Sequence, residues 1–180
     1  MEGGALHRTL ETQLNVWVDD RRKLLEEVEG LEPERLVARP LAGKWSILEI
    51  VEHLVLGDRD VLQGLPDPAN LVDRQRKLKH RVSYPLVMLV LACHIPAKVA
   101  SPRMIPRGES SVAELRREWD EIQRWLRSYV GQLDRGDLAK SVFAHPIAGP
   151  LTLGQALHMG ALHMATHTRQ IRRLESLTES

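Results

Sequence analysis

Hydrophobic residues recur every three or four positions in four segments of the chain, which is the spacing of one buried face of an α-helix. The first segment covers about residues 5–30, and Arg21 is the one gap in its apolar face. The other three begin near Ser46, Ser111 and Thr152. Because strict alternation is absent outside a short stretch, the pattern predicts an all-α protein with four long helices.

Three of these helices open with the signature of a capping box. A Ser or Thr side chain accepts a bond from the backbone N–H three residues on, and a Glu or Gln at that position bonds back to the cap. We expect the second helix to end at Gly64, the third to end near Gly131 and Gly136, and the fourth to end near Leu177. A short extended stretch is expected around 142–147. The predicted boxes are Ser46–Glu49, Ser111–Glu114 and Thr152–Gln155.

Residues 64–110 form a long connection between the second and third predicted helices. A structureless loop of that length is improbable in a compact domain, so we expect one or two accessory helices. One should begin near Pro85, where the missing N–H costs nothing. A short connection would make the two helices antiparallel neighbours, whereas a long crossover lets the second helix lie beside the fourth. The expected architecture is therefore a four-helix bundle with a long crossover.

Length and charge narrow the function classes. The 180 residues suit a single domain spanning 1–180. With 25 basic and 24 acidic residues the net charge is +1, which argues against a strongly basic nucleic-acid binder. A local basic run has no aromatic residues interleaved for base stacking, so it is typical of a solvated face and nucleic acid is not an expected partner. The run comprises Arg74, Arg76, Lys77, Lys79 and Arg81.

Cysteine usage and apolar runs bear on the compartment. The single cysteine, Cys93, excludes an intrachain disulfide, which fits a reducing cytoplasm. It sits in an apolar stretch, where we expect an inert core thiol. The longest mostly apolar run, residues 84–95, contains Pro85 and is too short to cross a bilayer. We therefore expect a cytoplasmic protein without a membrane span.

Two histidines occupy seam positions of the fourth predicted helix. His163 and His167 are one turn apart, with Cβ atoms about 6 Å from each other. Ala156 and Gly160 precede them on the same face and leave space. Such a pair can share a divalent metal ion. Buried histidines can equally be satisfied by hydrogen bonds, so a third ligand is needed to decide.

His53 is the candidate third ligand. It lies on the second predicted helix, at the edge of the buried stripe and four residues before Gly57. If the second helix neighbours the fourth, His53 faces the pair. Three neutral imidazoles with open coordination positions make a catalytic type of metal site. His158 lies about 180° around its helix from His167. The histidines expected to be ordinary are His7, His80, His94 and His145.

Two polar residues near these histidines have alternative interpretations. Glu49 lies one turn before His53 and could support it, although its part in the capping box is favoured. Gln170 lies close after His167. It either orients that ligand or is a polar residue at the solvent-exposed end of the seam.

Three sequence stretches resemble one known family. Residues 44–54 (KWSILEIVEHL), residues 145–153 (HPIAGPLTL) and the H-x-x-x-H-x-x-Q-I run from His163 resemble the DinB-like superfamily of four-helix-bundle metalloproteins. The resemblance implies a bundle with a long crossover and often a homodimer. It also implies one divalent metal ion, zinc or nickel, held by His53, His163 and His167.

The resemblance leaves the activity open. Some family members transfer low-molecular-weight thiols such as bacillithiol or mycothiol onto electrophiles, one branch isomerises maleylpyruvate, and others are thought to be hydrolases. We therefore expect a metal-dependent enzyme, a thiol S-transferase or a hydrolase, in which a metal-bound water or thiolate at the open coordination position attacks a small-molecule substrate. The alternative is a non-catalytic, metal-stabilised binding or stress-response protein. An open coordination position would favour the enzyme.

Overall fold

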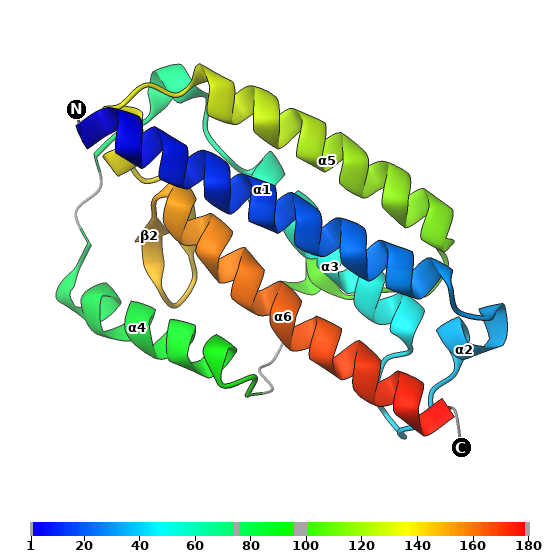
Figure 1. Ribbon diagram of the computed structural model, residues 1–180. Helices are drawn as coiled ribbons and strands as arrows, with labels where there is room; N and C mark the ends of the chain where they lie inside the picture. The colour runs from blue at the N-terminus through cyan, green and yellow to red at the C-terminus, as the bar shows by residue number, and fades with distance from the viewer. Residues whose placement is uncertain (1, 74–75, 96–100, 179–180) are drawn as a thin grey trace.

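The computed structural model describes residues 2–73, 76–95 and 101–178, with side chains from residue 8 onward. Its long helices are α1 (Glu2–Glu29), α3 (Ile47–Gln63), α5 (Val112–Gln132) and α6 (Leu153–Thr178), which pack as a bundle (Figure 1). The predicted all-α class is confirmed. The shorter elements are the helices α2 (Pro33–Val37) and α4 (Leu78–Ala92), the 3-10 turns η1 (Pro68–Asn70), η2 (Pro102–Met104) and η3 (Asp137–Ala139), and the strands β1 (Phe143–His145) and β2 (Gly149–Leu151).

The crossover decides which helices are neighbours. Helix α1 packs against α5 and α6, and α3 packs against the same two helices. Helices α1 and α6 run in one direction, while α3 and α5 run in the other (Figure 1). The connection that contains α4 carries the chain back along the bundle, so α3 and α5 become parallel neighbours. The prediction that α3 lies beside α6 is confirmed.

The three predicted capping boxes are all present. Ser46 and Glu49 exchange bonds of 3.3 and 2.8 Å at the start of α3. The equivalent pairs open α5 and α6 with the same geometry. Because each box satisfies two backbone N–H groups that the first turn leaves unpaired, these three helix starts are determined by local sequence.

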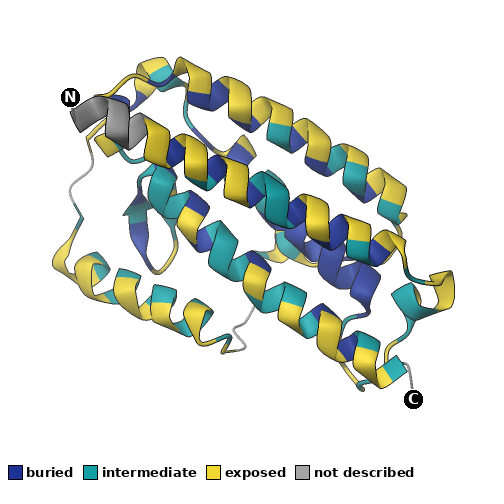
Figure 2. Ribbon diagram, in the orientation of Figure 1, coloured by how far each residue is buried: buried dark blue, intermediate teal, exposed yellow. Residues whose placement is uncertain are grey.

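The apolar seams of the four long helices meet in one core (Figure 2). Fully buried side chains come from every one of these helices, and each contributes about 1.5–3 kcal/mol of hydrophobic free energy. Helix α1 does not lose contact with the core at Arg21, whose side chain is 1% exposed. Examples from α1, α3, α5 and α6 are Val28, Ile50, Trp119, Leu126 and Ile171.

Arg21 is buried as one member of an ion pair. Its Nε and Nη2 groups donate to the Asp58 carboxylate at 2.7 and 2.8 Å. Asp58 also accepts a 2.7 Å bond from the indole N–H of Trp119, and the guanidinium lies 3.3 Å from the Trp17 ring centre. These contacts join α1, α3 and α5 inside the core. The apparent gap in the apolar face is therefore a buried polar junction.

Helix α4 differs from its prediction in where it begins. It starts at Leu78 rather than near Pro85, because the Lys77 carbonyl accepts bonds from the N–H groups of His80 and Arg81. Pro85 then lies inside the helix, where it removes one backbone donor. The basic residue Arg76 precedes the helix and donates to the Pro150 carbonyl at 2.8 Å. The residues before α4 therefore contact the β-hairpin where the helix begins.

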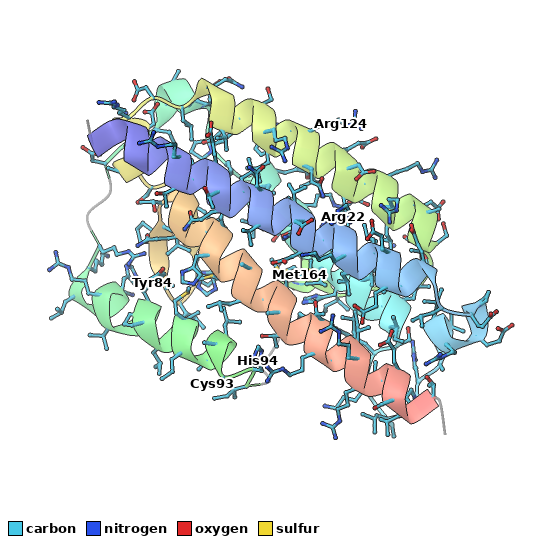
Figure 3. All side chains as sticks on the ribbon, in the orientation of Figure 1. Arg22, Tyr84, Cys93, His94, Arg124 and Met164 are labelled. Carbon is cyan, nitrogen blue, oxygen red and sulfur yellow. The ribbon has the colours of Figure 1, made fainter. Side chains whose placement is uncertain are left out.

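The prediction that Cys93 is a core thiol is wrong. Cys93 caps the C-terminus of α4 and is exposed (Figure 3). Helix α4 lies on the outside of the bundle, against α6 and β2, and none of its residues is buried. Its inner face, which includes Tyr84 and Met88, packs on a small cluster around Leu151. An apolar sequence around a cysteine therefore did not mean a buried cysteine.

A β-hairpin precedes α6. The predicted extended stretch is confirmed by β1, which pairs antiparallel with β2 in the register Phe143↔Leu151. The second strand and the short helix α2 had no expected counterpart. Gly149 begins β2 at φ +74°, and a Cβ there would lie 2.4 Å from the His80 ring. Only glycine fits this close approach of α4 to the hairpin.

Candidate metal centre

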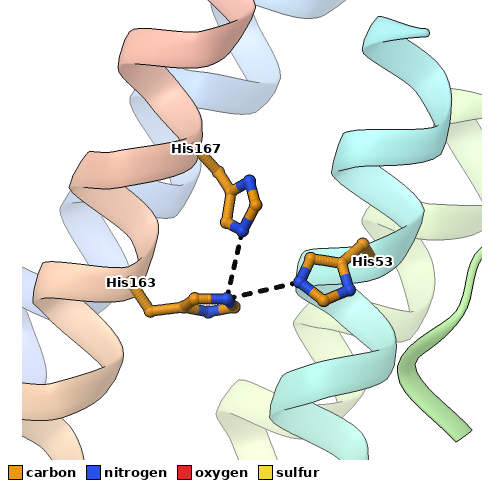
Figure 4. Close-up of side chains that lie close together, drawn as sticks. All are labelled: His53, His163 and His167. Atoms are coloured by element: carbon orange, nitrogen blue, oxygen red, sulfur yellow. Dashed lines mark hydrogen bonds between the residues drawn. The ribbon is translucent and has the colours of Figure 1, made fainter. Parts of the chain in front are cut away.

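Three histidine side chains from two helices meet between α3 and α6 (Figure 4). The Nε2 atom of His163 lies 3.3 Å from Nε2 of His53 and 3.1 Å from Nε2 of His167. One ring nitrogen from each residue lies within 4.8 Å of the other two. The structure thus brings together the three residues that were expected to hold a metal, because α3 does lie beside α6.

The orientation of His53 is set by a backbone carbonyl. Its Nδ1 lies 2.7 Å from the carbonyl oxygen of Met104, in η2. A carbonyl oxygen can only accept, so Nδ1 carries the proton and Nε2 keeps its lone pair. The Trp45 ring covers His53 at a centroid distance of 4.8 Å. His53 is 3% exposed and points its free lone pair at the other two histidines.

His167 is oriented by a side-chain amide. Its Nδ1 lies 3.1 Å from Oε1 of Gln170, and acceptance by this oxygen leaves Nε2 of His167 unprotonated. Of the two interpretations of Gln170, the geometry favours the orienting one. Glu49 instead accepts bonds from the Ser46 N–H and from Arg39, as expected for its part in the capping box.

Burial keeps these imidazoles neutral. Desolvation lowers the pKa of His53 and lowers the pKa of His163 well below its ordinary value, where neighbouring imidazoles add to the effect. The pKa of His167 falls to about 4, through burial first and then through His53. Near neutral pH all three rings therefore offer lone pairs rather than positive charge.

The donor set fits a divalent metal ion. His53 and His167 both direct a lone pair at Nε2 of His163, which can donate at most one N–H in return. The cluster thus has more acceptors than donors, and a cation resolves the excess. Metal–nitrogen bonds of about 2.0–2.1 Å in a tetrahedral site give N···N separations of about 3.3 Å. The two pairs that include His163 lie near this value, at 3.3 and 3.1 Å, and the ligand atoms of all three residues lie within 4.8 Å of one another.

Two glycines near the centre differ in how closely other side chains approach them. A Cβ on Gly57 would lie 3.9 Å from Cε1 of His163, which is ordinary contact. At Gly160 the approach is closer, since a Cβ there would lie 3.5 Å from Nε1 of Trp17. The space predicted before the histidine pair is therefore filled by Trp17 of α1.

The remaining histidines whose side chains the structure describes lie outside the cluster, as expected. His158 is exposed, and Nδ1 of His94 lies 3.0 Å from the hydroxyl oxygen of Thr166. His145 accepts bonds from two backbone N–H groups of the hairpin turn, at Ile147 and Ala148. The side chain of His7 lies outside the described residues.

Sequence reasoning missed several groups around the centre. The Met104 carbonyl belongs to the backbone of a distant segment, so no sequence signal could have identified it. Asp58 had a signal, because it follows Leu54 by four residues and Val51 by seven and so lies in the α3 seam. Together with Arg21 it places a charged pair in two facing seams.

The structure bears on two further expectations, the solvated basic run and the absence of a membrane span. Arg76 donates to Gln155 at 2.9 Å and lies over the Tyr84 ring, so this member of the run holds α4 against the hairpin and α6. Arg74 lies outside the described residues. Within the described ranges, every helix is too short or too polar to cross a membrane.

The fold and site define a four-helix-bundle protein with a three-histidine cluster between two helices. The family model of the DinB superfamily matches residues 17–171, so the chain belongs to this superfamily. It is 24% identical over 176 residues to the uncharacterized protein YuaE of Bacillus subtilis (strain 168). That alignment covers 92% of this chain and 99% of the relative. No solved structure matches the chain significantly.

Proposed function

We propose that the chain binds one divalent metal ion, zinc or nickel, through His53, His163 and His167. The observation that carries the proposal is the convergence of three neutral Nε2 atoms at 3.1 and 3.3 Å. The Met104 carbonyl and the Gln170 amide hold two of these ligands in the tautomer that a metal requires.

We further propose that the centre belongs to an enzyme, either a thiol S-transferase or a hydrolase. Structural zinc sites are closed by four protein ligands, whereas catalytic sites have three and keep a position open. Within the part of the chain that the structure describes, no fourth His, Cys, Asp or Glu joins the three histidines. A bound metal ion supplies Lewis-acid chemistry that makes a coordinated water or thiol more acidic.

The surrounding residues would hold this centre in a dry, fixed geometry. Trp45 covers one side of His53, and the buried pair of Arg21 and Asp58 joins α3, which carries His53, to α1. The neutral ligands leave the positive charge of the metal uncompensated, which favours an anionic nucleophile beside it. A low-molecular-weight thiol or a water molecule would meet this requirement, and the substrate would be a small electrophile or ester-like molecule.

The proposal is tested by the metal content per chain, measured by mass spectrometry on protein purified without a histidine tag. We expect about one divalent ion in the wild type and little in His53→Ala or His163→Ala. The matched control is His158→Ala on the exposed face of α6, which should keep the metal. A wild type that stays metal-free after incubation with zinc or nickel would contradict the proposal.

Activity assays then separate the two kinds of function. Loaded wild-type protein is screened for thiol transfer and for hydrolysis, with His163→Ala as the blank. Metal-dependent turnover supports the enzyme. Full loading without turnover in either screen favours the non-catalytic, metal-stabilised binding protein.

A further inference from the structure

A segment at the end of the crossover covers the site side of α3. We call residues 101–108 the strap. It contains η2, which packs on α3, and it supplies the Met104 carbonyl that accepts the Nδ1–H bond of His53. The orientation of one proposed metal ligand therefore depends on where the strap lies.

Glu52 holds the strap in place from the same helix. Its carboxylate is buried, at 6% exposure, and Oε2 accepts the backbone N–H groups of Arg107 at 3.0 Å and Gly108 at 2.6 Å. Bonds from backbone N–H groups to a carboxylate are charge-assisted and short. Glu52 and His53 are adjacent in α3, so two consecutive side chains bind the strap. Glu52 accepts from two backbone N–H groups of the strap, and His53 donates to one of its carbonyls.

The backbone conformation of Gly108 allows the strap to bind Glu52. Its backbone has φ +71°, a left-handed conformation that glycine adopts without strain. A Cβ at Gly108 would lie 3.3 Å from Cγ of Glu49, so the strap also approaches α3 closely there. Gly108 thus lets the backbone turn and present its N–H to Glu52.

We propose that Glu52 is a positioning residue for the metal centre: by anchoring the strap at Arg107 and Gly108, it places the Met104 carbonyl that fixes the tautomer of His53. This inference rests on the proposed function, since it assumes that His53 binds metal through Nε2. Partners that orient metal-binding histidines typically change metal affinity by about 10–100-fold when removed.

The first measurement needs no metal. In metal-free protein labelled with ¹⁵N-histidine, the two ring nitrogens of His53 report its tautomer by NMR, with the signals assigned from a His53→Ala sample. We expect a wild type protonated at Nδ1. In Glu52→Gln and Gly108→Ala we expect a mixture of tautomers, because the carbonyl is no longer held in place.

The second measurement is zinc affinity, determined by competition with a chelator. We expect Glu52→Gln and Gly108→Ala to lose about tenfold or more. Glu49→Gln is the matched control, a buried glutamate one turn earlier that bonds Ser46 and Arg39 rather than the strap backbone. It should lose stability through the capping box while keeping both the His53 tautomer and the affinity.

The outcomes separate the two proposals. A wild-type protein without metal would contradict the proposed function, and the His53 tautomer in the metal-free variants would still test the strap. An unchanged tautomer and unchanged affinity in both strap variants would overturn the role of Glu52. Equal changes in Glu49→Gln would overturn it as well, since they would show only a general loss of structure at the start of α3.

Discussion

Helices α3 and α4 are both rich in apolar residues, yet they end in opposite environments. Eleven residues of α3 are buried, whereas none of α4 is. The outer face of α4 exposes Leu78, Val82, Leu86 and Leu89. Helix α3 is enclosed by α5, α6 and η2, while α4 touches the bundle from one side. Topology, rather than the apolar content of a helix, decides how deeply it is buried.

The comparison extends to polar residues. Helix α3 buries Glu49, Glu52 and His53, and each of these side chains is hydrogen-bonded to a backbone group. Burying a polar group without a partner costs about 1–3 kcal/mol, so such groups persist where the surrounding structure satisfies them. Helix α4 carries its charged residues near its exposed N-terminal end. Helix α3 contributes His53 to the site that it shares with α6, whereas α4 contributes no residue to that site.

The largest expected effect is at the buried ion pair of α3. Asp58→Ala should lower the free energy of unfolding by about 3–5 kcal/mol, because it leaves the Arg21 charge buried without a partner. Burial already lowers the pKa of Arg21 to about 10, against the opposing effect of Asp58. Urea denaturation measures the loss.

A surface pair provides the control for Asp58. Glu27→Ala removes the partner of Arg172, and such exposed pairs contribute about 0–1 kcal/mol. The double variant Arg21→Met/Asp58→Leu should recover part of the stability, because an apolar pair replaces both charges while the indole N–H of Trp119 loses its acceptor. A loss at Asp58 no larger than at Glu27 would show that water reaches this junction.

The next effect compares the two helices directly. Ile50→Ala in α3 should cost about 2–5 kcal/mol, because it opens a cavity in the enclosed core. Leu86→Ala in α4 should stay within about 0.5 kcal/mol, since its side chain is already 59% exposed. Thermal and urea unfolding of both variants measure the difference.

A large loss of unfolding free energy in Leu86→Ala would contradict the contrast between the buried helix α3 and the exposed helix α4. It would mean that the outer face of α4 is covered in solution, as by a second copy in the homodimer that the family resemblance implies. The molar mass of the native protein, measured by light scattering, would then distinguish a dimer from a monomer. A monomer with a small loss at Leu86 would leave α4 as an exposed helix.

The same contrast shows what sequence could predict. The α3 start was predictable because the Ser46–Glu49 box is local. Seam spacing placed His163 and His167 on one helix face, and the family resemblance implied His53 as the third member. The start of α4 was not predictable in this way, because the contacts made there are with the distant residues Gly149 and Pro150. The exposure of Cys93 and the role of the Met104 carbonyl likewise depend on how the crossover lies across the bundle.

The smallest expected effect is the contribution of one histidine, His167, to the pH dependence of stability in the metal-free protein. The folded state lowers the pKa of His53, His163 and His167, so the unfolded chain binds more protons below about pH 6.5. For His167, whose folded-state pKa is about 4, this contribution to stability should be fully present above about pH 6.5 and should fall as the pH drops toward 4, by at most about 1.4 kcal/mol per pH unit. His167→Gln should flatten this slope, whereas His158→Ala, on the exposed face of α6, should leave it unchanged. The slope is measured by urea unfolding between pH 7 and pH 5. An equal slope in the wild type and in His167→Gln would show that the histidines of the site are as accessible to solvent as the outer face of α4.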